Sequence, residues 1–258
     1  MSGIVVRIED RPDGRVAHIT VDNAAKLNTL TARLMGELIE ACAVLEHDPH
    51  LRAVVLRGAG ERAFVGGADI REMAVLDQDS AERFITLVHR SCAALRALPV
   101  PVIAVIRGWA LGAGLELAAA ADLRIAAREA RFGMPEVRVG IPSVVEAALL
   151  PHLIGWGRTR WLLLTGETID AARALEWGLV EEVARQEQLE EVLGLLLDAI
   201  LAGGAHAVRI QKALIRKWED VSPAEGIEAG IAAFRDAYAT DEPARMMRRF
   251  LEAAARRT

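Results

Sequence analysis

Two glutamates stand twenty residues apart in surroundings that are unusual for a carboxylate. Glu116 is the one charged residue in the apolar run ALGAGLELAAAA (110–121), and Glu136 follows a proline in RFGMPEVRVG (131–140). Desolvating an unpaired carboxylate is costly or keeps it protonated, so a glutamate in an apolar run needs a reason. Two such groups that meet in space can act as a general acid and a general base.

Two glycine-rich bends, GGAD (66–69) and GAGLE (112–116), complete the pattern. Moving water across a C=C bond beside a carbonyl needs one group to activate water and one to transfer the α-proton. It also needs two N–H donors for the oxygen that gains enolate charge. Glycine-rich bends at helix starts supply such donors, because small residues let a ligand approach the backbone. The pattern therefore favours acid–base chemistry next to a carbonyl.

Each glutamate also has a structural explanation, which the residues alone leave open. Glu116 can face the positive end of a helix dipole or pair with a buried arginine. Glu136 follows a proline in an irregular segment, where a carboxylate normally faces solvent.

Other chemistries lack their parts. GAGERA (58–63) fits a loose dinucleotide pattern, but the following helix begins too late to hold a pyrophosphate. The chain has no GxSxG, HExxH, GxxxxGK or CxxC motif. His47 and His50 have HxxH spacing in a proline-containing loop, which favours a solvated helix end over a metal site. We expect no metal.

The composition indicates a globular chain with one large domain, alone or with a small appendage. The 258 residues are 52% apolar and 26% charged, with a net charge of −5 and 4% aromatic residues. These values argue against a broad nucleic-acid or membrane footprint. Two cysteines without CxxC spacing, and a start without signal-peptide layout, favour a reducing cytoplasm. No apolar stretch is long enough for a membrane span.

The elements that must position these residues follow from periodicity. Alternation over 14–23 predicts a half-buried strand, and helical spacing over 29–46 predicts a helix that Thr31 caps. A β-branched strand closed by glycines is expected over 51–60, before a helical region that reaches about residue 97. A further short strand is expected in 178–184.

A sequence echo suggests how these elements stack. AVVLRG (53–58) returns as IAVIRG (103–108), shifted by 50 residues, and a glycine bend and a helix follow each copy. This predicts stacked strand–strand–helix turns of a short spiral. From about residue 186 the pattern is almost purely helical.

Four segments together resemble the enoyl-CoA hydratase/isomerase (crotonase) family. They are RAFVGGADIREM (62–73), PVIAVIRGWALGAGLELAAAADLRIAA (101–127), ARFGMPEVRVGIP (130–142) and LTGETIDAARALEWGLVEEV (164–183). The resemblance implies an α/β crotonase-like spiral of ββα repeats, with a catalytic domain over 1–190. It also implies a helical C-terminal oligomerisation region over 191–258 that forms a homotrimer or a dimer of trimers.

The resemblance also implies an activity. The family's hydratases carry two glutamates, matched here by Glu116 and Glu136, and an oxyanion hole of two N–H groups, matched by Ala68 and Ala113. It implies reversible hydration of a 2-enoyl-CoA to a 3-hydroxyacyl-CoA, with coenzyme A as part of the substrate and no separate cofactor. Another reaction of the family (double-bond isomerase, decarboxylase or C–C lyase) and a non-catalytic scaffold are the alternatives.

Further positions are carried over from the family in the same way. Predicted coenzyme A contacts are Lys26, Leu27, Arg62, Ala68, Asp69, Ile70 and Arg71. Predicted contacts of the acyl pocket are Met73, Leu76, Trp109, Gly112, Pro135 and Ile141. Ordinary surface arginines and plain core packing are the alternative explanations.

The sequence departs from the family's pattern at two places. Ala113 stands where glycine is frequent, and its N–H is usable provided φ is negative there. GIPSVVEAALLP (140–151) replaces a glycine-rich turn. There Ser143 and Glu146 fit a capping box that opens a helix, or else Glu146 points into the pocket and selects the acyl chain.

Overall fold

The computed structural model describes residues 2–255 and contains two sheets. The larger sheet has the strand order β1-β2-β3-β5-β7-β10. Its strands are β1 (Gly3–Arg11), β2 (Gly14–Asp22), β3 (Leu51–Gly58), β5 (Val102–Ile106), β7 (Leu123–Ala127) and β10 (Glu182–Ala184). The β1–β2 pair is antiparallel and the other pairs are parallel. Parallel strands that are covered on both faces read as continuous apolar runs, as β5 does.

The smaller sheet runs beside the first, in the order β4-β6-β8-β9. Its strands are β4 (Ala63–Val65), β6 (Trp109–Leu111), β8 (Arg131–Gly133) and β9 (Thr168–Asp170). Each turn of the chain adds one strand to each sheet: β3 then β4, β5 then β6, β7 then β8. The two echo copies stack directly, since Val54 pairs with Val102 and Leu56 with Ala104. The predicted spiral is confirmed.

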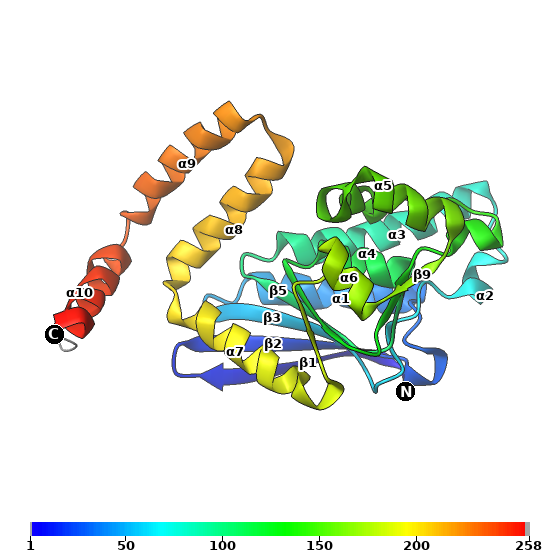
Figure 1. Cartoon of the computed structure of the whole chain (residues 1–258), viewed down its shortest axis with the longest axis horizontal. Helices are drawn as coiled ribbons and strands as arrows, with labels where there is room; N and C mark the ends of the chain where they lie inside the picture. Colours follow the sequence, from blue (N-terminus) through cyan, green and yellow to red (C-terminus); the bar gives the residue numbers. More distant parts are fainter. Residues whose placement is uncertain (1, 256–258) are drawn as a thin grey trace. The chain divides into compact units, whose positions relative to one another are not determined.

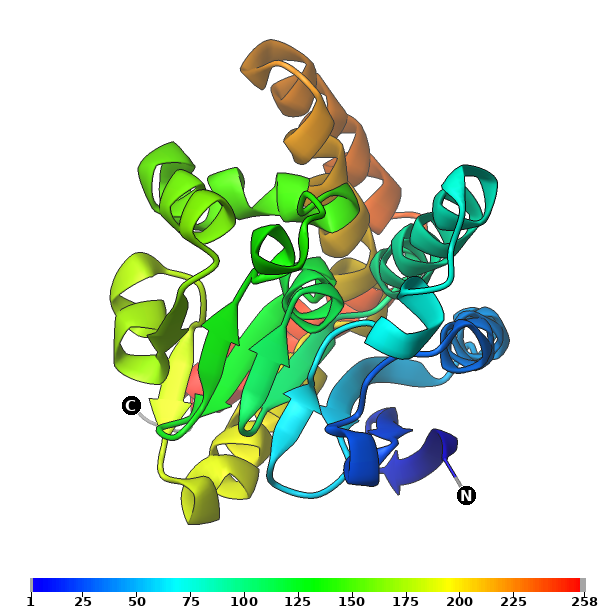
Figure 2. The same cartoon turned by 90° about the vertical axis from the view of Figure 1, so that its right-hand side faces the viewer.

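Helices connect the turns of this spiral. They are η1 (Ala24–Lys26), α1 (Ala32–Glu46), α2 (Ile70–Met73), α3 (Gln78–Ala97), α4 (Ala113–Ala120), η2 (Glu136–Val139), η3 (Val145–Leu149), α5 (Leu150–Thr165), α6 (Ala171–Trp177), η4 (Gln186–Gln188) and α7 (Leu189–Ala202). The Thr31 side chain accepts a hydrogen bond from Leu34 N, which confirms the predicted cap of α1. In Figures 1 and 2, α3, α4 and α5 lie on one side of the strands and the start of α7 lies on the other.

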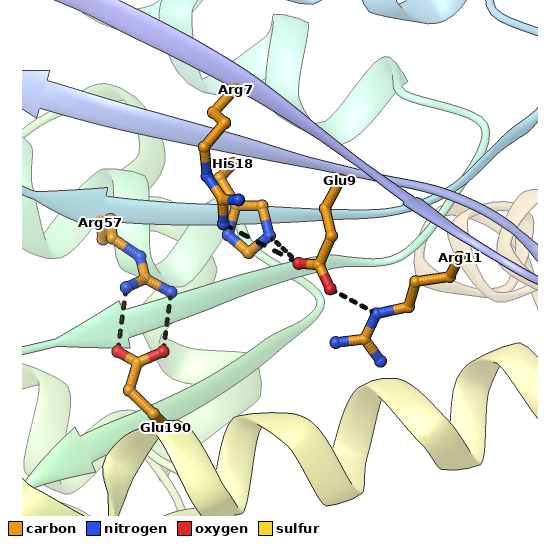
Figure 3. A network of polar contacts seen from close by, with 6 residues as sticks. All are labelled: Arg7, Glu9, Arg11, His18, Arg57 and Glu190. Atoms are coloured by element: carbon orange, nitrogen blue, oxygen red, sulfur yellow. Dashed lines mark hydrogen bonds and ion pairs between the residues drawn. The ribbon is translucent and has the colours of Figure 1, made fainter.

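The start of α7 is fastened to the sheet by the arginines of the two echo copies. Glu190 accepts hydrogen bonds from Arg57 at 2.9 Å and from Arg107 at 3.0 Å. Figure 3 shows Glu190 reaching from α7 to Arg57, with a second contact nearby in which Glu9 lies 2.8 Å from Nε2 of His18. The repeated Leu-Arg-Gly and Ile-Arg-Gly endings therefore have a structural use, because both arginines bind one carboxylate.

The chain forms two compact units that divide between Leu196 and Leu197, within α7. The predicted boundary at residue 190 lies slightly earlier in the same helix. The second unit contains α8 (Ala205–Asp220), α9 (Pro223–Ala237) and α10 (Glu242–Ala255). Ser222 and Glu225 form a capping box at the start of α9, and the Glu242 carboxylate accepts N–H bonds from the first turn of α8.

Three further features of the chain are its cysteines, its lack of a candidate membrane-spanning helix among residues 2–255, and its first strand. Cys42 and Cys92 are buried and are not joined by a disulfide. Among residues 2–255, no single helix is long and apolar enough to cross a membrane, although the bent pair 186–202 and 205–220 passes that test of length and composition jointly. Strand β1 was not predicted from the sequence, and its residues are half-buried to exposed.

Two helical glycines provide a matched test of the packing between α4 and β4. A Cβ on Gly114 would collide with the Val65 carbonyl, whereas a Cβ on Gly36 in α1 would meet no atom within 4 Å. We expect Gly114→Ala to lower the free energy of unfolding by about 1–3 kcal/mol. Gly36→Ala should raise it by about 0.5–1 kcal/mol, because alanine is the better helix former. Urea denaturation of both variants checks this, and equal effects would contradict it.

Candidate active site

The site is built around the glycine that precedes α4. Strand β6 leads into Gly112, whose φ of +50° is rarely adopted by residues with a side chain. A Cβ at this position would also collide with Oε1 of Glu136. Glycine at 112 therefore allows the Glu136 carboxylate to lie directly against the backbone at the start of α4.

Glu116 lies in the first turn of α4 and is only 4% exposed. Its Oε1 accepts a hydrogen bond from the N–H of Ala147 at 3.2 Å. Burial, followed by the charge of Glu136, raises the pKa of Glu116 to about 8, while the Ala147 N–H opposes the shift. A pKa in this range is suited to proton exchange near neutral pH.

Glu136 begins η2 and is half-buried. Its Oε2 accepts a hydrogen bond from the Ser143 hydroxyl at 2.8 Å. Burial raises the pKa of Glu136, and the Ser143 hydrogen bond partly offsets that effect. The structure thus brings Glu116 and Glu136 close enough for the charge of Glu136 to act on Glu116.

Two backbone N–H groups are available beside these carboxyls. Among the hydrogen bonds between described residues, none uses the N–H of Ala68 or of Ala113. Ala113 is the first residue of α4, where helix N–H groups have no partner within the helix. The backbone φ of Ala113 is not positive, which is the requirement stated above for its N–H to be usable. Leu30 bonds to Gly67 O and to Asp69 N, and these bonds fix the loop on both sides of Ala68.

A cavity of about 410 Å³ gathers most of the predicted contacts. Predicted residues that line it are Lys26, Ala68, Asp69, Ile70, Arg71, Met73, Gly112, Pro135, Glu136 and Ile141. Gly66 and Gly67 of the predicted glycine-rich bend also line it, and the lining residues not predicted from the sequence are Thr29, Leu111, Arg138 and Val139. The cavity is thus bounded by both glycine-rich bends and by η2.

Some predicted contacts lie outside that lining. Leu27 has a left-handed backbone with φ +55°, and Arg62 is exposed. Leu76 packs against the hydrophobic core, and Trp109 is 38% exposed on β6. Ala113 and Glu116 also do not line the cavity, although Gly112, between Leu111 and Ala113, does.

Cations surround one part of the cavity. Nζ of Lys26 lies 3.5 Å from the Asp69 carboxylate, which also accepts the N–H of Arg71 and so caps α2. Burial opposes ionisation of Asp69, but the Arg71 N–H and the Lys26 charge outweigh it, so the pKa of Asp69 is lowered. Among residues 2–255, no group of three or more His, Cys, Asp or Glu residues is arranged to hold a metal ion.

Asn28 supports the site and was not predicted from the sequence. It is fully buried, and its side-chain amide donates to Ala59 O at 3.0 Å and to Ala63 O at 2.8 Å. It has φ +56°, a left-handed conformation that asparagine tolerates better than most residues. Asn28 therefore ties the Lys26 segment to the entry of β4. The signal available in the sequence was an asparagine next to the predicted contacts Lys26 and Leu27, in AKLNTL (25–30).

The predicted capping box of Ser143 and Glu146 is wrong. η3 begins at Val145 after a cap residue, Val144, with no side-chain cap bond. The Ser143 hydroxyl donates to Glu136 instead, and a positive φ of +39° at Val145 turns the chain away from helical geometry. Glu146 is buried, and Nδ1 of His89 lies 2.8 Å from its Oε1.

The raised pKa of Glu116 predicts a pH-dependent cost to stability. Unfolding returns the carboxyl to its ordinary pKa, so the folded state loses stability as pH rises from the unfolded to the folded pKa. Glutamine at position 116 carries no charge at any of these pH values. We therefore expect the free energy of unfolding of Glu116→Gln, relative to that of the native chain, to rise by on the order of 4 kcal/mol between about pH 5 and about pH 9. Urea denaturation at both pH values measures this. A stability difference independent of pH would contradict it.

Comparison with known proteins agrees with this architecture. The family model for enoyl-CoA hydratase/isomerase matches residues 11–256. The chain is similar to the short-chain-enoyl-CoA hydratase of Clostridium acetobutylicum, with 34% identity over 93% of this chain and 92% of the relative. It is also similar to the crotonyl-CoA hydratase of Syntrophomonas wolfei, with 35% identity over 92% of each.

A solved structure supports the same assignment. The crystal structure of enoyl-CoA hydratase from Bacillus anthracis superposes with a TM-score of 0.91 at 33% identity, covering 97% of this chain and 96% of that one. Fold, family model and full-length relatives therefore agree, and this chain belongs to the enoyl-CoA hydratase/isomerase family.

Proposed function

We propose that this chain is an enoyl-CoA hydratase, which adds water reversibly to a 2-enoyl-CoA thioester and forms a 3-hydroxyacyl-CoA. One observation carries the proposal: Glu136 lies against Gly112, beside the unpaired N–H of Ala113 and close enough to Glu116 to raise its pKa. Relatives named as short-chain-enoyl-CoA and crotonyl-CoA hydratases, which span 92–93% of this chain, support it.

In the proposed complex, the thioester oxygen accepts hydrogen bonds from the N–H groups of Ala68 and Ala113. Negative charge that develops on this oxygen is favoured by the positive end of α4. Each donor contributes about 3 kcal/mol to stabilising the transition state, by the usual size of such contacts. Both donors are on backbone that other hydrogen bonds hold in place, so little reorganisation is needed.

The two glutamates handle water and protons in this proposal. Water between them is activated by Glu116 for attack at C3, Glu136 delivers a proton to C2, and the roles reverse on dehydration. A pKa of about 8 lets Glu116 accept and return a proton near neutral pH. The reaction has no redox step and needs no separate cofactor.

Coenzyme A would bind at the cationic part of the cavity. Lys26, Arg71 and Arg138 line it there, and phosphate groups pair well with arginine. Lys26 and Arg71 were predicted from the family, and Arg138, which also pairs with Glu167, is a further cationic residue of the lining.

We also propose that the second unit mediates assembly into a homotrimer or a dimer of trimers. Helix α9 carries an exposed apolar stripe of Ile227, Ile231 and Phe234, spaced by four and three residues. A stripe of exposed apolar side chains on one face of a helix is suited to burial against a second copy of the chain. A cytoplasmic location stays a prediction from the sequence.

Replacing either glutamate by glutamine should nearly abolish hydration. We expect Glu116→Gln and Glu136→Gln each to lower kcat on crotonyl-CoA at least about a hundredfold, because an amide cannot transfer the proton. The loss of enoyl absorbance measures the rate. Glu190→Gln serves as a control, since this carboxylate pairs with Arg57 and Arg107 away from the cavity lining. Near-native hydration by Glu136→Gln would overturn the assignment.

The same assay separates hydration from the other reactions of the family. A native chain that converts 3-enoyl-CoA faster than it hydrates any 2-enoyl-CoA would establish isomerisation instead. A panel of 2-enoyl-CoA thioesters that differ in chain length and branching then defines the acyl preference.

Ala113 allows a test of the backbone donor itself. Proline is tolerated at the first position of a helix and lacks the N–H, so Ala113→Pro removes the donor and keeps a helix start. We expect it to lower kcat about a hundredfold or more. Ala113→Gly retains the N–H and should keep most of the activity. Equal rates for the two variants would exclude an oxyanion role for this N–H.

A further inference from the structure

A contact between the buried carboxylate of Glu146 and the exposed side chain of His89, which the proposed chemistry does not use, lies one residue from a hydrogen bond to Glu116. Glu146 is 6% exposed, and its Oε1 lies 2.8 Å from Nδ1 of His89 on α3. The next residue, Ala147, donates its N–H to Oε1 of Glu116 at 3.2 Å. The position of that N–H therefore depends on where the Glu146 backbone is held.

The backbone at this point is strained. Val145 has φ +39°, in a region that β-branched residues almost never adopt. A conformation of this kind costs on the order of 1–3 kcal/mol and persists only where surrounding contacts enforce it. The 2.8 Å contact between Glu146 and His89 is such a contact, and the segment is the one in which the sequence departs from the family's glycine-rich turn.

The Glu146 carboxylate is also incompletely satisfied. Its Oε2 is buried and has no N–H or O–H partner among residues 2–255, and the nearby donor is the weak thiol of Cys92. Burying a carboxylate with an unfilled acceptor lowers stability. Retaining it here is consistent with a use at the adjacent site rather than with a contribution to stability.

We propose that Glu146 is a positioning residue: its hydrogen bond with His89 fixes the turn at Val145, so that the N–H of Ala147 holds the Glu116 carboxyl in place. The proposal rests on the proposed function, because it assigns Glu116 to proton transfer. Glu146 itself does not contact substrate in this account.

Electrostatics around Glu116 agree with that placement. The groups that face it are Glu136 on η2, Glu146 on η3 and Cys92 on α3, with Arg96 acting on Cys92. The charges of Glu136 and Glu146 both raise the pKa of Glu116. Burial, followed by the charges of Glu146 and Glu116, raises the pKa of Cys92, so the thiol stays neutral beside them.

Alanine variants of the pair test the positioning role. We expect Glu146→Ala and His89→Ala each to lower kcat on crotonyl-CoA about tenfold, with KM changed less than about twofold, because only the geometry of Glu116 is disturbed. The double variant should be no slower than either single variant, since both remove one interaction. His89→Asn keeps an N–H donor near the position of Nδ1 and should restore most of the rate. His152→Ala, an exposed histidine on α5, is the control.

The charge-neutral variant provides a readout that loose packing would not move. Glu146→Gln keeps the shape and an acceptor oxygen but removes a charge that raises the Glu116 pKa. The limb of the kcat–pH profile that belongs to Glu116 should therefore move to lower pH. Isotope-edited infrared spectroscopy of the protonated Glu116 carboxyl, identified by its absence in Glu116→Gln, should show the same downward move without reference to activity.

Distinct outcomes would overturn the inference. Native kcat in folded Glu146→Ala and His89→Ala variants would exclude a positioning role. A loss confined to acyl chains that carry a hydrogen-bond donor would make Glu146 a substrate contact instead. If Glu146→Ala does not fold, His89→Ala, His89→Asn and Glu146→Gln decide. A native chain that hydrates no 2-enoyl-CoA refutes the proposed function. The infrared titration of Glu116 in His89→Ala, which keeps the Glu146 charge, then decides the positioning role: loss of the Ala147 N–H bond should raise the pKa of Glu116, and an unchanged titration would exclude the role.

Discussion

The Glu136 carboxylate lies against the α-carbon of Gly112, where any side chain would collide with it. This close approach places one carboxyl beside the start of α4, while Glu116, four residues further along the same helix, supplies the other. Because α4 is buried along its length, both groups lie in a medium of low polarity and their charges act on each other. The unpaired N–H of Ala113 belongs to the same helix turn, so one glycine organises three of the groups in the proposed chemistry.

That arrangement requires α4 to be held rigidly, and the spiral does so. Gly114 lets the helix approach the Val65 carbonyl of β4, and β6 feeds directly into Gly112. The strands that carry these residues stack in parallel, with copies fifty residues apart in the sequence lying side by side. Arg57 and Arg107, equivalent in the two copies, bind Glu190 at the start of α7. Repetition in the sequence thus becomes a shared anchoring point in the fold.

The turn at Val145 shows how a local departure from the family's pattern alters the surroundings of the site. A glycine-rich turn would need no support, because glycine adopts positive φ without strain. Here a valine occupies that conformation, and a buried glutamate and a histidine from α3 lie beside it. The third carboxyl changes the electrostatics of Glu116 as well as its geometry, since its charge favours the protonated form.

Much of this was accessible from the sequence. Periodicity determined the helix that Thr31 caps and the strand at 14–22, and the echo of AVVLRG in IAVIRG determined the stacking of the spiral, because local patterns report how each element buries one face. Strand β1 was not predicted because it lies at a sheet edge, where its residues are mostly exposed and show no clear alternation of apolar and polar residues. The family motifs indicated which glutamates and which backbone N–H groups are the candidate site groups.

Other features were decided only by the tertiary structure. Three contacts join residues from different parts of the chain. Glu136 lies against Gly112, the Ser143 hydroxyl donates a hydrogen bond to Glu136, and His89 contacts Glu146. Sequence spacing predicted a capping box for Ser143. In the fold the Ser143 hydroxyl donates its hydrogen bond to the carboxylate of Glu136 instead. The pKa of Glu116 was likewise decided by burial and by charges from η2 and η3. Local sequence specifies which groups are present, whereas distances between groups on separate elements exist only once the spiral has closed around them.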